Sequence, residues 1–96
     1  MDKQQVLQTL RAAKPMLAER YDVTRLALFG SIARDEARPD SDVDIIVGFD
    51  GPATSARYFG VQFYLEDELN CVVDLVTEKA LRAELKPHIE REAVSV

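Results

Sequence analysis

The sequence predicts an α+β fold, in which helices pack on a small β-sheet. Three short aliphatic runs are typical of buried strands: "RLALF" at residues 25–29, "DVDIIVGF" at 42–49 and "CVVDLV" at 71–76. The segments around them have helical spacing or turn signals, so helices and strands alternate along the chain. Periodicity alone fixes neither the order nor the direction of the strands.

The first predicted helix covers residues 6–21, whose apolar side chains recur at helical spacing. Pro15 interrupts this pattern, which predicts either a kink or two short helices. After the first strand, a short helix is expected at 31–37, between the Gly30-Ser31 pair and the turn-like "RPDS".

The second half of the chain predicts one long helix and one broken one. Residues 54–69 form the long helix, with Thr54 or Ser55 as its cap. Its apolar residues extend around most of its circumference. This predicts either a wide face buried in the core, or a core on one side and a partner on the other. Residues 77–92 have helical turns that we expect to be broken around Pro87.

The composition limits the classes of function. Ninety-six residues predict one domain, residues 1–96. The net charge of −5 argues against direct binding of nucleic acid and is compatible with a basic or mixed-charge protein partner. With one cysteine, Cys71, and one histidine, His88, the usual zinc ligands are missing. We expect a buried, inert thiol at Cys71 and a surface position for His88.

Targeting signals are not visible in the sequence. Met1 is followed by polar residues, and no apolar run approaches roughly eighteen residues. We therefore expect a cytoplasmic protein without membrane contact.

Three aspartates stand where strands are expected. Asp42 and Asp44 are two residues apart on one strand, so their side chains share a face, and Asp74 lies inside another aliphatic run. Their aliphatic flanks predict a buried acidic triad, and charged carboxylates are rarely buried unless they are paired or bound to metal. Carboxylates about 6 Å apart repel by roughly 3 kcal/mol per pair at an effective dielectric near 20. Two divalent cations would remove this repulsion, and oxygen-only ligands suit Mg²⁺ or Mn²⁺. The pattern predicts a two-metal phosphoryl-transfer site.

The Gly30-Ser31 pair predicts a phosphate pocket in the same cleft. Glycine permits close backbone approach, and Ser31 would begin a helix whose N–H groups attract anions. Arg34, one turn later, either neutralises a phosphate or is a solvated side chain. Simpler interpretations remain open at this point. Ser31 is then only a helix cap, Asp42 belongs to an exposed turn, and Asp44 and Asp74 pair with arginines such as Arg25 or Arg34.

These residues resemble the signature of the DNA polymerase beta-type nucleotidyltransferase superfamily. Gly30-Ser31 is followed after ten residues by Asp42-x-Asp44, with Asp74 on a later strand. The chain's short length, "RLALFGS", "RPDSDVDIIV", "VVDLVT" and the "EREAV" tail are similar to the minimal nucleotidyltransferases, the antitoxins paired with HEPN-domain toxins. Departures from the family pattern, such as Asp35 where relatives often have glycine, remove no presumed metal ligand.

The resemblance implies a mixed β-sheet with helices packed on it, in a polymerase beta-like nucleotidyltransferase fold. It also implies roles for the residues. Asp42 and Asp44 would bind two Mg²⁺ ions, with Mn²⁺ as an alternative, and Asp74 would bind the catalytic ion and help deprotonate the acceptor hydroxyl. Gly30 and Ser31 would hold the triphosphate of ATP, with Arg34 as a further nucleotide-binding candidate.

The implied function is an adenylyltransferase antitoxin that modifies a hydroxyl of a HEPN toxin, a tyrosine by the resemblance. We expect the toxin to be encoded by the adjacent gene and to form a hetero-oligomer with this chain. Two rival functions are a transferase acting on a small-molecule hydroxyl and a non-catalytic binder that occludes its partner. The first lacks residues for an acceptor domain, and the second has no need of an acidic triad.

Overall fold

A four-stranded mixed sheet organises the protein, whose computed structural model describes residues 2–96. The strand order is β3-β2-β1-β4; β1 is antiparallel to β2 and β4, and β2 is parallel to β3. This confirms the predicted fold class. The elements in chain order are α1 (Lys3–Tyr21), β1 (Val23–Phe29), α2 (Gly30–Ala33), β2 (Val43–Phe49), α3 (Ser55–Leu69), β3 (Val73–Thr77), the 3₁₀ helix η1 (Glu78–Ala80), α4 (Lys86–Glu92) and β4 (Val94–Ser95).

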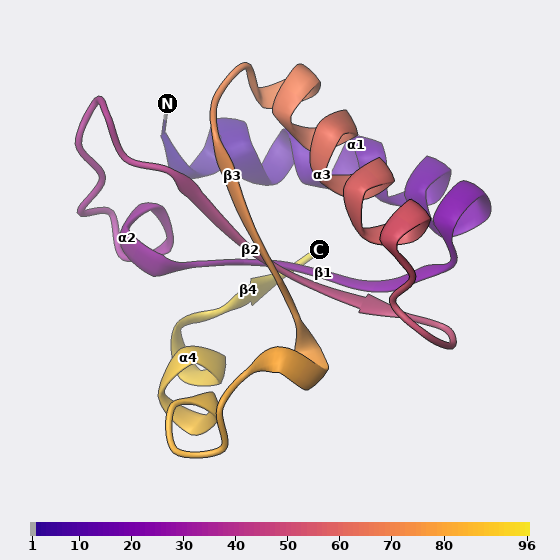
Figure 1. Cartoon of the computed structure of the whole chain (residues 1–96). Helices are drawn as coiled ribbons and strands as arrows, with labels where there is room; N and C mark the ends of the chain where they lie inside the picture. The colour runs from indigo at the N-terminus through magenta and orange to yellow at the C-terminus, as the bar shows by residue number, and fades with distance from the viewer. Residues whose placement is uncertain (1) are drawn as a thin grey trace.

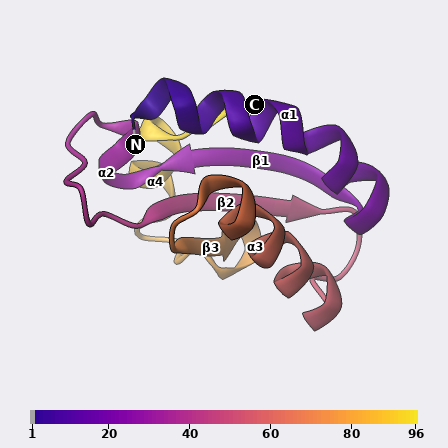
Figure 2. The same ribbon diagram turned by 90° about the horizontal axis from the view of Figure 1, so that it is seen from above.

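The sheet separates two unequal layers. Figure 1 shows α1 and α3 on one side of the strands and α4 on the other, and Figure 2 shows α1 running along β1. Successive side chains of a strand point to opposite faces. One face therefore carries the core under α1 and α3, to which the central strands contribute Leu26, Leu28, Val43, Ile45 and Val47. The other face carries Ala27 and Ile46, which are also fully buried.

Helix α1 is a single helix that contains Pro15, so the prediction of two short helices was wrong. Asp2 caps it in a reciprocal capping box with Gln5, and the helix begins three residues earlier than predicted. A proline inside a helix leaves the carbonyl four residues earlier without its partner. That residue is Arg11, and both it and Pro15 are exposed, so water can satisfy the carbonyl.

The predicted short helix at 31–37 is half as long in the structure. Helix α2 ends at Ala33 because Asp35 adopts the left-handed conformation, with a φ of 58°, which no helix continues. The three strands are found where predicted, with ends that differ by one or two residues. Thr54 caps α3, as expected, by accepting a hydrogen bond from the Arg57 amide.

The C-terminal segment differs most from its prediction. Pro87 lies in the first turn of α4, where its missing N–H costs nothing, so it helps to begin this helix instead of breaking it. The chain then forms β4, which the sequence did not predict. This two-residue strand pairs with Ala27 and Leu28 of β1. Short strands have too few residues for a periodic signal, and β4 depends on β1 for its hydrogen bonds.

Helix α3 also covers the outer edge of the sheet. Side chains from three successive turns bind the backbone of β3. The Glu66 carboxylate accepts from the Val73 N–H at 3.0 Å, the Gln62 amide donates to the Val73 carbonyl at 3.2 Å, and the Tyr58 hydroxyl donates to the Leu75 carbonyl. Exposed strand edges invite pairing with other chains. Here three of the outward-facing groups of β3 are bound by side chains of the same molecule.

No helix within residues 2–96 is both long and apolar enough to cross a membrane. Cys71 has a free thiol, as predicted, but its side chain is only partly buried. Burial still raises the pKa of this thiol, so it is a weak nucleophile.

Candidate functional site

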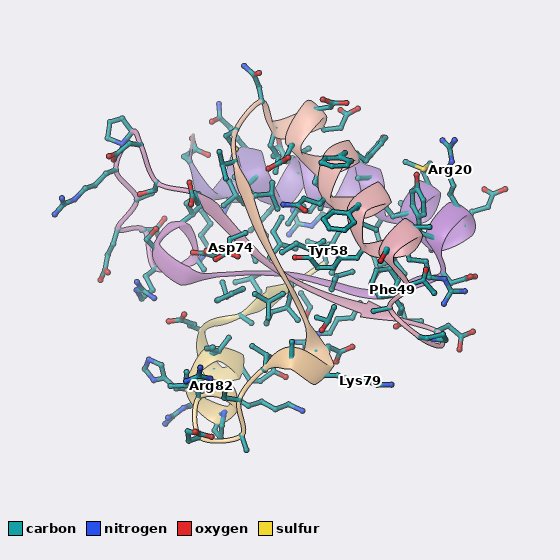
Figure 3. The ribbon with its side chains drawn as sticks, viewed as in Figure 1. Arg20, Phe49, Tyr58, Asp74, Lys79 and Arg82 are labelled. Carbon is teal, nitrogen blue, oxygen red and sulfur yellow. The ribbon has the colours of Figure 1, made fainter. Side chains whose placement is uncertain are left out.

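The sheet register brings two of the predicted acids side by side. Asp44 on β2 is opposite Phe29 of β1 on one side and opposite Asp74 of β3 on the other. Neighbouring strands are about 4.8 Å apart, so the two aspartates are immediate cross-strand neighbours. Both point to the face opposite the α1–α3 core, because Val43, Ile45, Val73 and Leu75 point into that core. Figure 3 shows the labelled Asp74 side chain on the side of β3 that faces α2.

The electrostatics of the site centre on Asp44. Burial, then the charges of Asp74 and Asp42, raise the pKa of Asp44 from 3.8 to about 6. Asp74 also shares a hydrogen bond with Asp44, which favours the protonated form. Neither Asp44 nor its two acidic neighbours forms an ion pair with any residue from 2 to 96. The positive charge of Arg34 lowers the pKa of Asp44 by a smaller amount, so among residues 2–96 the site keeps a concentration of negative charge.

Two expectations about these acids were wrong. The triad is not buried: Asp42 and Asp74 are exposed, and only Asp44 is half-buried. The alternative that arginines pair with Asp44 and Asp74 also fails, because Arg25 binds Glu78 and Glu90 on the same sheet face. Asp42 lies between the turn that precedes β2 and the strand itself, so the exposed-turn interpretation was partly right for this residue.

The donor set suits a hard divalent cation. The three aspartates offer only carboxylate oxygens, which Mg²⁺ and Mn²⁺ prefer. Within the described part of the chain, however, no three such side chains are already close enough to hold an ion. Asp44 and Asp74 are adjacent, whereas the exposed Asp42 has to turn toward them. The charge accumulated on Asp44 provides the electrostatic reason for such a cation to bind.

Glycine is required at position 30. The residue has a φ of +76°, and a Cβ atom there would lie 2.0 Å from the Asp44 Oδ2 atom. The backbone of the Gly30-Ser31 turn therefore lies directly against the central carboxylate. This contact places the two halves of the predicted signature, the Gly-Ser pair and the aspartates, in one site.

Helix α2 is too short to supply a strong dipole. It has four residues, Gly30 to Ala33, and Phe29 occupies its N-cap position, so the interpretation of Ser31 as a simple helix cap was wrong. Ser31 lies in the first turn and is partly exposed beside Gly30. Any attraction of this turn for an anion must come mainly from individual donors, since the macrodipole of so short a helix is small.

Arg34 is held by two glutamates. Its Nε donates to Glu36 at 3.1 Å, and its Nη1 donates to both carboxylate oxygens of Glu92 at 3.1 Å. These hydrogen bonds, Glu92 first, raise the pKa of Arg34, although 43% of the side chain is exposed. Arg34 is thus not a free solvated side chain. It forms no ion pair with the aspartates, although its charge lowers the pKa of Asp44.

Glu92 is the residue that sequence reasoning missed. It ends α4, and its Oε1 atom also accepts the Gly30 N–H at 3.2 Å. Sixty-two positions separate Glu92 from Gly30 in the chain. The "EREAV" tail carried a family resemblance, but no periodic pattern connects it with the Gly30 turn.

Helix α3 presents an aromatic surface next to the covered edge. Val61, Leu65 and Leu69 are buried, whereas Phe59 and Phe63 are 47% and 59% exposed. The two phenylalanine rings stack with their centroids 5.9 Å apart. The interpretation that the wide apolar face is entirely buried was therefore wrong. His88 is exposed on α4, as predicted.

The structure places carboxylates of two adjacent strands next to the Gly-Ser turn. The sequence predicted this arrangement for a site of phosphoryl transfer. Residues 10–96 match the family model of the nucleotidyltransferase domain. The chain therefore belongs to the nucleotidyltransferase family, which confirms the resemblance and the class of enzyme.

Two proteins with more than 30% sequence identity are similar to this chain over most of its length. A third, at 19% identity, shows only that the fold is shared. Protein adenylyltransferase MntA of Thermococcus cleftensis is 39% identical over 87 residues, or 91% of this chain and 88% of that protein. The structure of a candidate minimal nucleotidyltransferase matches with a TM-score of 0.83 at 36% identity, covering 100% of this chain and 97% of the other. A chain from the complex of tri-AMPylated HEPN toxin and MNT antitoxin of Shewanella oneidensis has a TM-score of 0.59 at 19% identity. It covers 97% of this chain and 66% of the other.

Proposed function

We propose that this protein is an antitoxin that transfers AMP from ATP to a hydroxyl, that of a tyrosine, on a HEPN-domain toxin and thereby neutralises it. The observation that carries the proposal is the register that sets Asp44 beside Asp74 and against Gly30. The name of the Thermococcus relative, a protein adenylyltransferase, supports AMP as the transferred group. The Shewanella complex supports a HEPN toxin as the partner. That this toxin is encoded by the adjacent gene and forms a hetero-oligomer with the chain is part of the proposal.

Each site residue has a role in this reaction. Asp42, Asp44 and Asp74 would hold Mg²⁺, which when bound neutralises the aspartates and stabilises the charges of the reacting oxygens. The Gly30 turn, Ser31 and Arg34 bind the triphosphate and align its α-phosphorus. Asp74 is the exposed member of the adjacent acid pair, so it can reach an incoming hydroxyl and accept its proton.

The atoms balance as in other nucleotidyl transfers. The acceptor oxygen forms a bond to the α-phosphorus, the bond from this phosphorus to the bridging oxygen breaks, and pyrophosphate leaves in line. The acceptor loses one proton to Asp74, and the product is a phosphodiester between AMP and the toxin hydroxyl.

One observation favours a second candidate, neutralisation by binding alone. The stacked pair of Phe59 and Phe63 gives α3 an exposed apolar surface, and such surfaces are enriched where proteins associate. An antitoxin that neutralises its partner by binding alone would need this surface but would not need the three aspartates. The two functions therefore differ in whether the aspartates matter.

Co-expression with the product of the adjacent gene, which we propose to be the HEPN toxin, tests the proposal. Intact-mass analysis should show AMP-sized increments on the partner with the wild-type chain and none with the Asp42→Asn, Asp44→Asn double variant. Asp40→Asn, an exposed substitution in the preceding turn, is the matched control and should modify the partner fully. An unmodified partner that is silenced equally by wild type and double variant would establish the occluding binder instead.

A further inference from the structure

The anion-binding donors of the site already hold a carboxylate. Glu92 accepts from the Gly30 N–H and from Arg34 Nη1, and its side chain is only 17% exposed. The proposed function assigns the same two donors to the triphosphate. We propose that Glu92 occupies a phosphate position in the free protein, that ATP must displace it, and that Glu92 therefore sets the affinity for the nucleotide. This inference rests on the proposed function.

The geometry makes the two occupants exclusive. The Gly30 amide has a single hydrogen, and Glu92 accepts it. A phosphate oxygen can take that hydrogen only if the Glu92 carboxylate moves away. A carboxylate that stayed in place would also hold its negative charge against the phosphates, beside the uncompensated charge of Asp44. Displacement removes both obstacles at once.

The guanidinium of Arg34 can exchange a carboxylate partner for a phosphate. A guanidinium has five N–H donors in a planar fork that matches carboxylates and phosphates alike. Nε donates to Glu36 and Nη1 to Glu92, whereas Nη2 donates to no carboxylate among residues 2–96. Glu36 can therefore keep hold of Arg34 while Nη1 and Nη2 turn to the nucleotide.

Glu92 also lies on a helix, α4, that can move without exposing buried residues of its own. None of the residues of α4 is buried. The helix is attached through Glu92, through the bidentate pair of Glu90 with Arg25 and through β4. Releasing Glu92 breaks polar contacts and opens no hydrophobic core. Nucleotide binding should accordingly loosen the last turn of α4.

The experiment measures binding of a non-hydrolysable ATP analogue by calorimetry, first in EDTA and then with Mg²⁺. Glu92→Gln keeps the size of the side chain and an acceptor for Gly30 but removes the charge. We expect it to bind the analogue roughly tenfold more tightly than wild type, because a charge-assisted contact no longer competes. Glu84→Gln is the matched control. It removes one negative charge from an exposed side chain that forms no ion pair within residues 2–96, so affinity should change less than twofold.

The outcomes separate the two proposals. If wild type binds the analogue and Glu92→Gln binds equally or more weakly, the displacement is wrong while the proposed function stands. Equal tightening by Glu84→Gln would also overturn it, since the loss of any negative charge would then suffice. No binding by wild type or either variant would overturn the proposed function and this inference with it.

Two further measurements keep the test decisive. Thermal melts establish that each variant is folded, and Glu92→Asp, whose shorter side chain cannot reach both donors, replaces Glu92→Gln if the latter is not. In wild type, the amide resonances of Gly30 and of the last turn of α4 should shift together when the analogue is added. An unmoved α4 signal at saturation would contradict displacement.

Discussion

The charge on Asp44 should lower the stability of the folded protein. Asp44→Asn, which has no charge at this position, should therefore be more stable than wild type at neutral and higher pH. In the folded protein the pKa of Asp44 is about 6, against 3.8 for an unperturbed aspartate. A carboxyl group with a raised pKa binds its proton more tightly in the folded state, so wild-type stability falls as pH rises from about 4 to about 6. Asp44→Asn removes this loss. The variant should therefore be more stable than wild type at pH 8 and about equally stable at pH 4.

The magnitude follows from the two pKa values. Their difference corresponds to about 3 kcal/mol of unfolding free energy if it acts in full. Asp44 is only half-buried, and solvent screens part of the charge, so we expect a gain of about 1 to 3 kcal/mol at pH 8. For a protein of this size, that gain raises the melting temperature by roughly 5 to 20 °C.

The assay compares thermal and urea unfolding of both proteins at pH 4, 6 and 8 in EDTA. Asp40→Asn, on an exposed turn, is the control and should change stability by less than about 0.5 kcal/mol at every pH. The reasoning is refuted if Asp44→Asn is no more stable than wild type at pH 8, or if its advantage is the same at all three pH values.

Three further predictions test the metal site, the left-handed turn and the surface of α3. Mg²⁺ should raise the melting temperature of wild type, by the equivalent of about 1.4 kcal/mol at ten times its dissociation constant, and should leave Asp44→Asn unchanged; an equal rise in both would place the ion elsewhere. Asp35→Gly should stabilise the protein by roughly 0.5 to 1 kcal/mol in urea unfolding, because the φ of 58° strains a side chain but not glycine. A loss of stability would contradict that strain. Leu65→Ala should cost about 2 to 5 kcal/mol, whereas Phe63→Ser, at a side chain that is 59% exposed, should cost less than about 1 kcal/mol; similar costs would mean that Phe63 is packed.

The fold was predictable where one local pattern decided the structure. The aliphatic runs identified all three long strands, and Thr54 identified the start of α3, because burial and capping are read from adjacent residues. The errors lie where a distant contact decides. Pro15 stays inside α1 because the carbonyl it leaves free is exposed, and β4 exists because β1 offers hydrogen bonds to it.

The sequence predicted which residue types form the candidate site. It did not predict which acids are neighbours or how exposed they are. Spacing placed Asp42 and Asp44 on one strand, but only the parallel pairing of β2 with β3 makes Asp74 the neighbour of Asp44. Burial of the triad was inferred from the aliphatic flanks, which in fact point to the other face of the sheet. A strand with one buried face leaves its alternate residues on the other face, so hydrophobic neighbours in sequence do not bury a side chain.

Glu92 helps to determine which charged side chains of the site pair with one another. The aspartates form no ion pair with residues 2–96, while Arg34, near the Gly30 turn, is held by two glutamates. The charge of Arg34 lowers the pKa of Asp44, but its hydrogen bonds go to Glu36 and Glu92, so it stays within reach of the proposed phosphate position. A site that paired Arg34 with Asp44 would be more stable alone but would compete with both metal and nucleotide. On the proposed function, the nucleotide has to displace Glu92, whereas a metal ion would meet carboxylates that form no ion pair with residues 2–96. The cation should therefore bind without having to break an ion pair.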